Sequence, residues 1–116
     1  RTWRYHRGLL DRTRCFYPDE KIDAWLAAFG GYTDLDEAIE KSQFAQAWGE
    51  KLLVDRCRQR KFDCGGILLW KIGACWPCVD LALLDFYLEP LLALDYIAEA
   101  FKPVAVSFYQ APESDE

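Results

Sequence analysis

The cysteines have the most specific spacing for chemistry in this sequence. Cys75 and Cys78 flank Trp-Pro, and two intervening residues are typical of redox dithiols and of half a zinc site. Cys57 and Cys64 could supply two more thiolates, but six residues separate them, whereas a zinc ribbon uses two close pairs. We therefore predict buried structural cysteines, with no metal and no cofactor, and keep a CxxC redox or zinc-binding protein as a less favoured alternative.

The other titratable residues form no complete catalytic group. His6 is the only histidine, and its Arg-rich aromatic surroundings favour a packing or surface role over a Ser-His-Asp arrangement. Acidic pairs such as Asp34 with Asp36 and Asp80 with Asp85 are typical of helix caps and solvated faces. None ends an apolar strand, where a raised pKa would be expected. We predict no catalytic residue in this chain.

Trp70 is the candidate binding residue. It lies in the carboxyl-terminal part of the apolar run 67–72, which predicts a strand buried on both faces, as in parallel sheets. Parallel α/β folds place ligands at the carboxyl ends of their strands, and a flat indole there can stack on the apolar face of a sugar. A core tryptophan is the alternative interpretation.

Three helices are predicted, over 18–29, 34–61 and 90–101. Pro18 and Pro90 suit first helical positions, and apolar residues recur at three- and four-residue spacing in each segment. A second strand is predicted over 104–108 and a solvated tail over 112–116. The order helix, strand, helix, strand indicates an α/β fold, and a lone buried strand would need further strands at both edges.

The second helix carries the clearest local signals. Thr33 and Asp36 resemble a capping box, Ser42 marks a possible join between two helices, and the basic run 56–61 suits the negative end of the helix dipole. Its apolar residues at helical spacing are expected to face a core: Leu35, Ala38, Ile39, Ala45, Trp48, Leu52 and Leu53.

Composition limits the classes of partner. The chain has 116 residues, enough for one domain or part of one, and a net charge of −5 that argues against nucleic acid and anionic membranes as partners. No apolar run approaches the roughly 20 residues that span a bilayer. With 52% hydrophobic residues, 16% aromatics and no Met, we expect an excerpt of a longer chain whose apolar surface meets missing partners. Five cysteines, an odd number, leave a free thiol or indicate a reducing compartment, and the localisation stays open.

Three segments together resemble a known family. Cys64-Gly-Gly-Ile-Leu-Leu-Trp-Lys-Ile-Gly-Ala-Cys-Trp-Pro77, Leu84-Asp-Phe-Tyr-Leu-Glu-Pro90 and Lys102-Pro-Val-Ala-Val106 follow one another in that order. They resemble the end of the catalytic barrel in glycoside hydrolase family 2, in its β-mannosidase and exo-β-glucosaminidase-like branch. The likeness covers about residues 20–107.

The resemblance implies a fold. Residues 1–103 would be the C-terminal segment of a catalytic (β/α)8 TIM barrel, and 104–116 would begin a β-sandwich domain or linker. Within the barrel, 34–61 would supply the seventh helix, 66–72 the eighth strand and 90–101 the eighth helix. This agrees with the α/β order of the predicted elements.

The resemblance also implies an activity. Family members are retaining enzymes in which one Glu protonates the leaving oxygen and a second attacks the sugar, with carboxyls about 5 to 5.5 Å apart. Those glutamates follow strands four and seven of the barrel, so both would lie upstream of Arg1. Trp70 would be a wall of the −1 sugar pocket, with Trp76 a weaker candidate on the same loop. The implied partners are a β-glycoside substrate and the remainder of the barrel.

One departure from the family pattern bears on specificity. Gly73 and Ala74 stand where the family usually shows Asn and Asp, so two side chains that could hydrogen-bond sugar hydroxyls are missing. A site that bonds a hydroxyl discriminates strongly, so β-glycosides other than mannosides stay open. A non-enzymatic helical interaction module that buries its aromatics against a partner is the main alternative to a glycosidase.

Overall fold

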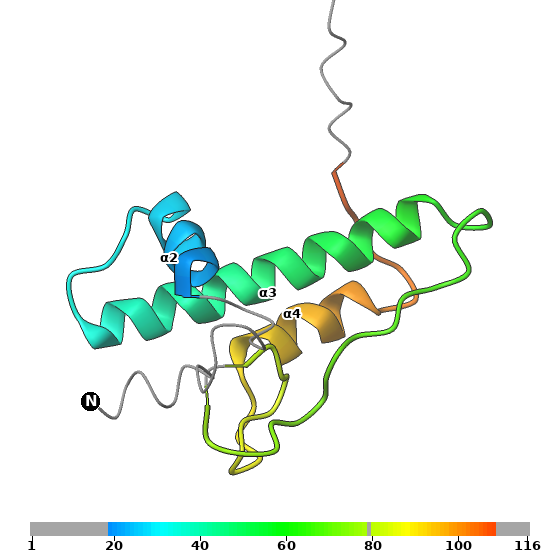
Figure 1. Cartoon of the computed structure of the whole chain (residues 1–116). Coiled ribbons are helices and arrows are strands. Elements are labelled where there is room, and N and C mark those ends of the chain that lie inside the picture. Colours follow the sequence, from blue (N-terminus) through cyan, green and yellow to red (C-terminus); the bar gives the residue numbers. More distant parts are fainter. Residues whose placement is uncertain (1–18, 79, 109–116) are drawn as a thin grey trace, which may run out of the picture.

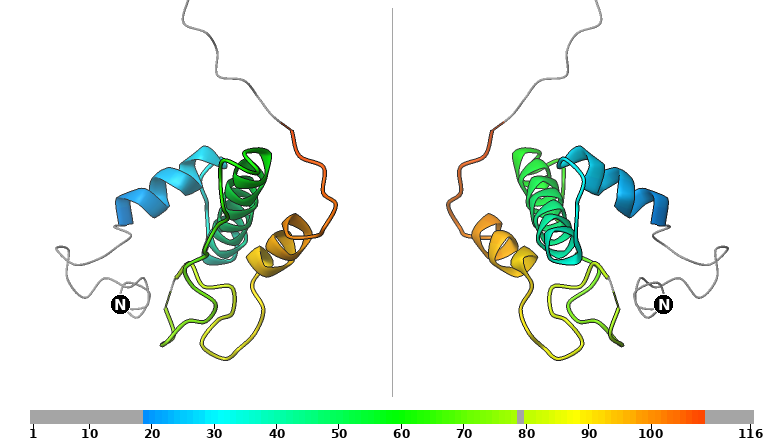
Figure 2. Two further views of the ribbon diagram at one scale, coloured as in Figure 1. Left: turned by 90° about the vertical axis from the view of Figure 1, so that its right-hand side faces the viewer. Right: turned by 90° about the vertical axis from the view of Figure 1, so that its left-hand side faces the viewer.

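The computed structural model of the chain describes residues 19–78 and 80–108. The described residues contain three helices, α2 (Asp19–Ala28), α3 (Leu35–Gln59) and α4 (Leu92–Ala100). Helix α3 is the long central element in Figure 1, and it packs against both α2 and α4. Figure 2 shows α2 and α4 on opposite sides of α3. All three helices were predicted, and their ends differ from the predicted ends by no more than two residues.

Helix α3 begins at a capping box that lies one residue later than predicted. The Asp34 carboxylate accepts a hydrogen bond from the Glu37 backbone N–H at 2.9 Å, so Asp34 is the N-cap. The Glu37 carboxylate in turn accepts from the Thr33 N–H and hydroxyl, at 2.7 and 2.9 Å. Glutamate reaches back to this N–H more easily than the shorter Asp36, so the predicted pairing of Thr33 with Asp36 was wrong.

The predicted join at Ser42 was also wrong, because α3 continues through it without a break. The Ser42 hydroxyl donates a hydrogen bond to the Ile39 carbonyl at 3.0 Å, one turn earlier in the same helix. A serine that bonds back to its own helix is accommodated in the helix interior.

The core lies between α3, α4 and the chain that precedes α4. Small residues there let the two helix backbones approach closely, since Ala47 is 0% exposed and Ala93 1% exposed. Leu83 and Ile97 complete the buried cluster. The partly buried residues around it are Leu69, Leu92, Leu94 and Tyr96.

The face of α3 that meets this core differs from the predicted one. Of the predicted stripe, only Ala38 is buried and Ala45 is half-buried. The core side of α3 is marked instead by Ala47 and Val54. Helix α4 docks where α3 has small side chains, and the larger apolar residues of the stripe stay exposed: Leu35, Ile39, Trp48, Leu52 and Leu53.

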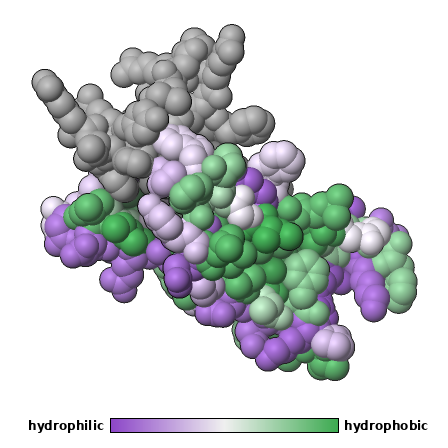
Figure 3. All heavy atoms as spheres, turned by 90° about the horizontal axis from the view of Figure 1, so that it is seen from below, coloured by the Kyte–Doolittle hydropathy of each residue, from purple (hydrophilic) through white to green (hydrophobic). Residues whose placement is uncertain are grey.

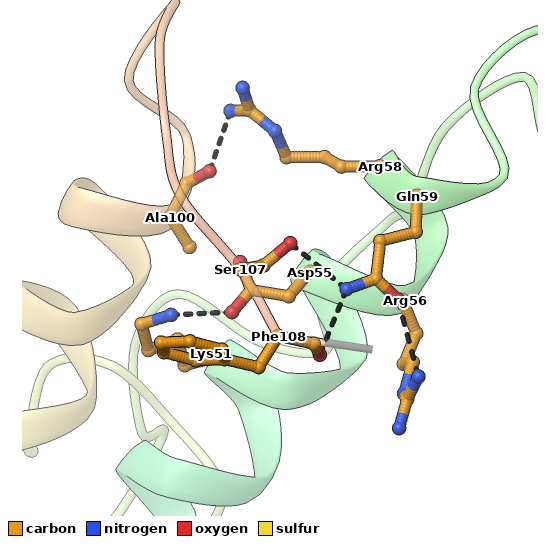
Figure 4. Close-up of polar contacts among 8 residues, drawn as sticks. All are labelled: Lys51, Asp55, Arg56, Arg58, Gln59, Ala100, Ser107 and Phe108. Atoms are coloured by element: carbon orange, nitrogen blue, oxygen red, sulfur yellow. Dashed lines mark hydrogen bonds and ion pairs between the residues drawn. The ribbon is translucent and has the colours of Figure 1, made fainter. Parts of the chain in front are cut away.

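The end of α3 holds the chain that leaves α4. The Arg58 guanidinium donates to the Ala100 carbonyl at 2.7 Å (Figure 4). It also donates to the carbonyls of Lys102 and Pro103, at 2.6 and 3.3 Å. Ala100 is the last residue of α4, so Arg58 satisfies carbonyls at the C-terminus of α4. The basic end of α3 was predicted to compensate its own dipole, and Arg58 serves the neighbouring helix as well.

The predicted strand over 104–108 is wrong. These residues are irregular, and the Gln59 amide donates to the Ser107 hydroxyl at 2.9 Å and to the Phe108 carbonyl at 3.1 Å (Figure 4). Among residues 19–78 and 80–108 there is no strand that could pair with this segment. A side chain of α3 satisfies polar groups of Ser107 and Phe108 instead.

The predicted strand over 67–72 is not a strand in the described part of the chain. The nearest sheet-like contact is a single parallel bridge between Leu84 and Gly73, the residue that follows this segment. Its side chains are not buried on both faces, since Leu68 and Ile72 are exposed. A strand exists only with hydrogen-bonded neighbours, and the described residues supply backbone bonds only at the end of this segment, to the carbonyls of Lys71 and Ile72. The barrel predicted from the resemblance is therefore not seen, and the described chain is helical with long loops.

Figure 1 places the long connection between α3 and α4 below the two helices. No helix within residues 19–78 and 80–108 is both long enough and apolar enough to cross a membrane.

Candidate functional site

Trp70 lies on the outward side of the 67–72 segment. Its side chain is 83% exposed, and its neighbours two residues away, Leu68 and Ile72, are also exposed. Between them, Leu69 packs against the core. This alternation of inward and outward side chains is that of an extended chain. Trp70 is therefore not packed in the core of the described residues, and its role as a binding residue stays a prediction.

Apolar side chains gather in the middle of the face seen from below in Figure 3. This is the side on which Figure 1 draws the connection between α3 and α4. Exposed large apolar residues of that connection include Phe62, Leu68, Trp70 and Ile72. Apolar patches of this kind mark surfaces that meet a ligand or further protein.

Trp76, the second predicted binding residue, is half-buried. It follows Trp70 by six residues and belongs to the same connection between α3 and α4. Trp70 presents far more of its ring to a ligand than Trp76 does, so of the two it is better placed as a stacking surface.

Lys71 organises the loop that follows Trp70. Its ammonium lies 2.7 Å from the Asp80 carboxylate and donates a longer hydrogen bond to the Cys75 sulfur at 3.8 Å. The hydrogen bond that Lys71 donates to the Asp80 carboxylate raises the pKa of Lys71, so the ammonium stays charged at neutral pH. This pair joins the two ends of the loop that contains Cys-Trp-Pro-Cys.

The two cysteines of this loop do not form an activated dithiol. The Cys78 thiol donates to the Asp80 carboxylate at 3.9 Å, and burial followed by the Asp80 charge raises the pKa of Cys78. Reactive thiols instead have lowered pKa values. Cys75 is exposed, so the prediction that the cysteines are buried is wrong there, while the other three described cysteines are half-buried.

No group of three or more His, Cys, Asp or Glu side chains in residues 19–78 and 80–108 could hold a metal ion. This finding gives no support to the zinc alternative built from the four described cysteines. His6 lies outside the described residues.

The 67–72 segment is held in place by the core residue Leu83. The Leu83 backbone N–H donates to the carbonyls of Lys71 and Ile72, at 3.2 and 3.0 Å. The amide of Gln46 on α3 donates to the Ala82 carbonyl at 3.1 Å. The central helix therefore fixes the chain that in turn fixes Trp70 and Lys71.

Glu50 supports the same contact. Its carboxylate accepts a hydrogen bond from Gln46 at 3.0 Å, and burial raises the pKa of Glu50. Sequence reasoning missed Gln46 and Glu50, although polar residues four apart on the side of α3 near Ala47 could have indicated them. It also missed Lys71, a cation inside an apolar run that needed a carboxylate partner.

The acidic residues act in caps and turns. Asp34 caps α3, as predicted for residues of this kind. The Asp85 carboxylate accepts from the backbone N–H groups of Tyr87 and Glu89, at 2.7 and 2.9 Å, which closes a turn before α4. Neither carboxylate is arranged for acid and base chemistry.

Comparison with known proteins points to a class of carbohydrate-cleaving enzyme. No protein-family model matches the chain, and no solved structure matches it. Part of the chain is nevertheless similar to glycosidases of family 2.

The particular relatives are fungal β-mannosidases B. The chain is 35% identical over 77 residues to β-mannosidase B of Aspergillus flavus, and 36% identical over the same length to that of Aspergillus niger. The chain is 35% identical over 77 residues to β-mannosidase B of Aspergillus terreus. The similarity covers 64% of this chain, and the chain spans only 9% of the length of these relatives.

Proposed function

We propose that this chain is the C-terminal part of the catalytic barrel of a retaining, exo-acting β-glycosidase of glycoside hydrolase family 2. The observation that carries the proposal is the 35% identity over 77 residues to β-mannosidase B. Residues 64–77, which carry much of the family resemblance, include Trp70. The indole of Trp70 is 83% exposed. The whole protein would hydrolyse O-glycosidic bonds of a carbohydrate.

In this proposal Trp70 is a wall of the −1 sugar pocket. An aromatic face stacks on the apolar C–H face of a sugar and gains from excluding water there. Lys71, paired with Asp80, and Leu83, bonded to the backbone of the segment, hold the indole in position. Trp76 contributes a second, smaller surface from the same loop.

The remainder of the barrel is the second proposed partner. The exposed apolar side chains of Leu68 and Ile72 would pack inside the completed barrel. The backbone of 67–72 is hydrogen-bonded mainly at Lys71 and Ile72. Neighbouring strands of the barrel would hydrogen-bond along both of its edges. Both catalytic glutamates would come from those other parts, since the described carboxylates serve caps and turns. Neither nucleic acid nor a membrane is a partner in this proposal.

A chimera tests the proposal. The segment of Aspergillus niger β-mannosidase B that aligns with this chain is replaced by residues 20–107, and hydrolysis of an aryl β-mannoside, β-glucosaminide and β-glucuronide is measured. The chimera is expected to cleave at least one of the three. Trp70→Ala in the chimera is expected to lower kcat/KM by about tenfold for each 1.4 kcal/mol of transition-state stacking that is lost.

Trp48→Ala is the matched control, because Trp48 is a half-exposed tryptophan on α3, outside the proposed pocket. It is expected to leave KM unchanged and to affect only thermal stability. A folded chimera without turnover, or equal loss of kcat/KM in both variants, would contradict the proposal. So would turnover by the 116-residue chain alone, which contains no complete acid and nucleophile pair in this account.

Gly73 and Ala74 give a test of the sugar. An ideal Cβ at Gly73 meets nothing within 4 Å, so a side chain fits there. The double variant Gly73→Asn with Ala74→Asp in the chimera restores the usual family residues. It is expected to raise kcat/KM for the β-mannoside relative to the other two substrates, because new hydroxyl bonds discriminate. An unchanged ratio would contradict a role for these positions in sugar choice.

A helical interaction module is the competing function. It predicts that the 116-residue chain alone is a compact monomer or homodimer that melts cooperatively. The barrel proposal predicts loose packing or association through the exposed apolar face. Light scattering and circular dichroism of the isolated chain distinguish the two.

A further inference from the structure

Two cysteines meet at the turn that ends α3. Cys57 lies in the last turns of the helix, and the chain then reverses so that the backbone N–H of Cys64 donates to the Arg60 carbonyl at 2.8 Å. The Asp63 N–H donates to the same carbonyl at 3.1 Å. Arg60 is about one helical turn beyond Cys57, so this turn returns Cys64 to the neighbourhood of Cys57. The Cys64 thiol donates a hydrogen bond to the Gly66 carbonyl at 3.4 Å, and Cys64 is also among the groups that raise the pKa of Cys57, as a neighbouring thiol does.

We propose that Cys57 and Cys64 are an oxidation site, forming an intramolecular disulfide when the chain meets a low-molecular-weight disulfide such as oxidised glutathione. This proposal is independent of the proposed function. It concerns a pair of residues that neither the sugar pocket nor the loop around Lys71 uses.

The reaction balances as two thiol–disulfide exchanges. The thiolate of one cysteine attacks a sulfur of oxidised glutathione, forms a mixed disulfide and releases one glutathione thiolate. The thiolate of the second cysteine then attacks the protein sulfur of that mixed disulfide and releases the second glutathione. The protein loses two protons and two electrons, and one molecule of oxidised glutathione becomes two of reduced glutathione.

The geometry favours this pair over Cys75 and Cys78, although Cys75 and Cys78 are closer to each other in the sequence. The backbone turn at Arg60 returns Cys64 towards Cys57, and the Cys64 thiol itself bonds only an uncharged backbone carbonyl, that of Gly66. In the other pair, Cys75 accepts a hydrogen bond from Lys71, whereas Cys78 donates to Asp80. Each of those two thiols has a charged partner that the bond would have to displace.

Both cysteines of the proposed site are half-buried, so a small disulfide can reach them. Burial, followed by the hydrogen bond with Cys64, raises the pKa of Cys57. Since the thiolate is the attacking species, formation is expected to be slow at neutral pH and faster in mild alkali.

Tryptic mapping of the full chain tests the proposal. Cleavage after Arg56, Arg58 and Lys61 places Cys57 on the dipeptide 57–58 and Cys64 on the peptide 62–71. Cys75 and Cys78 fall together on a third peptide, and Cys15 on a fourth. The chain is incubated with oxidised glutathione, free thiols are alkylated, and the digest is analysed by mass spectrometry without reduction.

The expected product is the dipeptide 57–58 joined to the peptide 62–71, and this link is expected to disappear on treatment with a reductant. Cys75→Ser is expected to leave the link unchanged, and Cys57→Ser to replace it with a glutathione adduct on Cys64. In denaturant the preference is expected to shift to Cys75 and Cys78, because they close the shorter loop.

Oxidation of Cys75 to Cys78 in the native chain, with Cys57 and Cys64 still open to alkylation, would overturn the proposal. The same pairing pattern in native and denatured chain would also overturn it, because the folded turn would then have no part in the choice.

Discussion

The helix pair α3 and α4 and the 67–72 segment are both rich in apolar residues, yet only the helices adopt regular structure. A helix satisfies its backbone N–H and C=O groups within itself, so α3 needs only a cap at Asp34 and one packed side. An extended segment satisfies its groups only against neighbours, and Leu83 supplies the main contact here. Helices are therefore specified locally, whereas a strand-like segment takes regular form only where other chain pairs with its backbone.

The same contrast holds for the side chains. Ile97 and Leu69 both face the core between α3 and α4, but Leu68 and Trp70, adjacent to Leu69, face outward. The helix pair is thus a finished interface, while the segment has one packed side and one open side. Substitutions on the packed side should therefore cost more stability than substitutions on the open side.

Ile97→Ala removes a buried side chain from the finished interface. We expect it to lower the free energy of unfolding by about 2 to 5 kcal/mol, through lost burial and the cavity that remains. Leu68→Ala, at a residue that is 99% exposed, is expected to change it by less than about 0.5 kcal/mol. Urea unfolding followed by circular dichroism measures both, and equal losses would contradict the contrast.

Arg58→Ala removes the contacts between the end of α3 and the chain after α4. The guanidinium bonds the carbonyls of Ala100, Lys102 and Pro103, so we expect a loss of about 2 kcal/mol in the free energy of unfolding. Arg60→Ala, at an exposed arginine two residues further along the chain, is the control and should cost much less. If both arginines proved equivalent, charge alone and not carbonyl bonding would explain the effect.

Asp34→Ala removes the N-cap of α3. The Glu37 N–H then loses its acceptor, and we expect a loss of about 1 kcal/mol in the free energy of unfolding. Asp36→Ala is the matched control, since Asp36 is the residue that the sequence first indicated for the box. A larger effect at Asp36 than at Asp34 would contradict the observed register of the cap.

Glu37 adds a pH dependence of smaller size. Hydrogen bonds from Lys41 and Thr33 lower the pKa of Glu37 from 4.5 to about 2. A carboxyl with a lowered folded-state pKa stabilises the fold above its unfolded pKa, and this stabilisation is lost as the pH falls from about 4.5 through about 2. Glu37→Gln should flatten the stability profile in that window, as measured by thermal melts at a series of pH values. An unchanged profile would show that Glu37 has no such role.

The sequence allowed the helices to be predicted closely, because proline, glycine and capping residues act within a few positions of a helix end. It did not allow the buried face of α3 to be predicted, because close packing selected the small Ala47 over the larger Trp48. It misjudged 67–72, whose pattern suits a strand that the described neighbours cannot complete.

The binding role of Trp70 was named from its place in an apolar run and stays a prediction, and in the structure its indole is exposed. The pairing of Lys71 with Asp80 could not be predicted, because the two residues meet only through the fold of the intervening loop. Gln46 was missed for the same reason, since its partner Ala82 is distant in the sequence.

Amide hydrogen exchange tests most directly whether 67–72 is a barrel strand waiting for its neighbours. We expect the amides of Leu68, Leu69 and Trp70 to exchange rapidly in the isolated chain and to become strongly protected in an active chimera with β-mannosidase B. The amides of α3 and α4 should be protected in both. Equal protection of 67–72 in the isolated chain and the chimera, or rapid exchange there in an active chimera, would contradict this expectation.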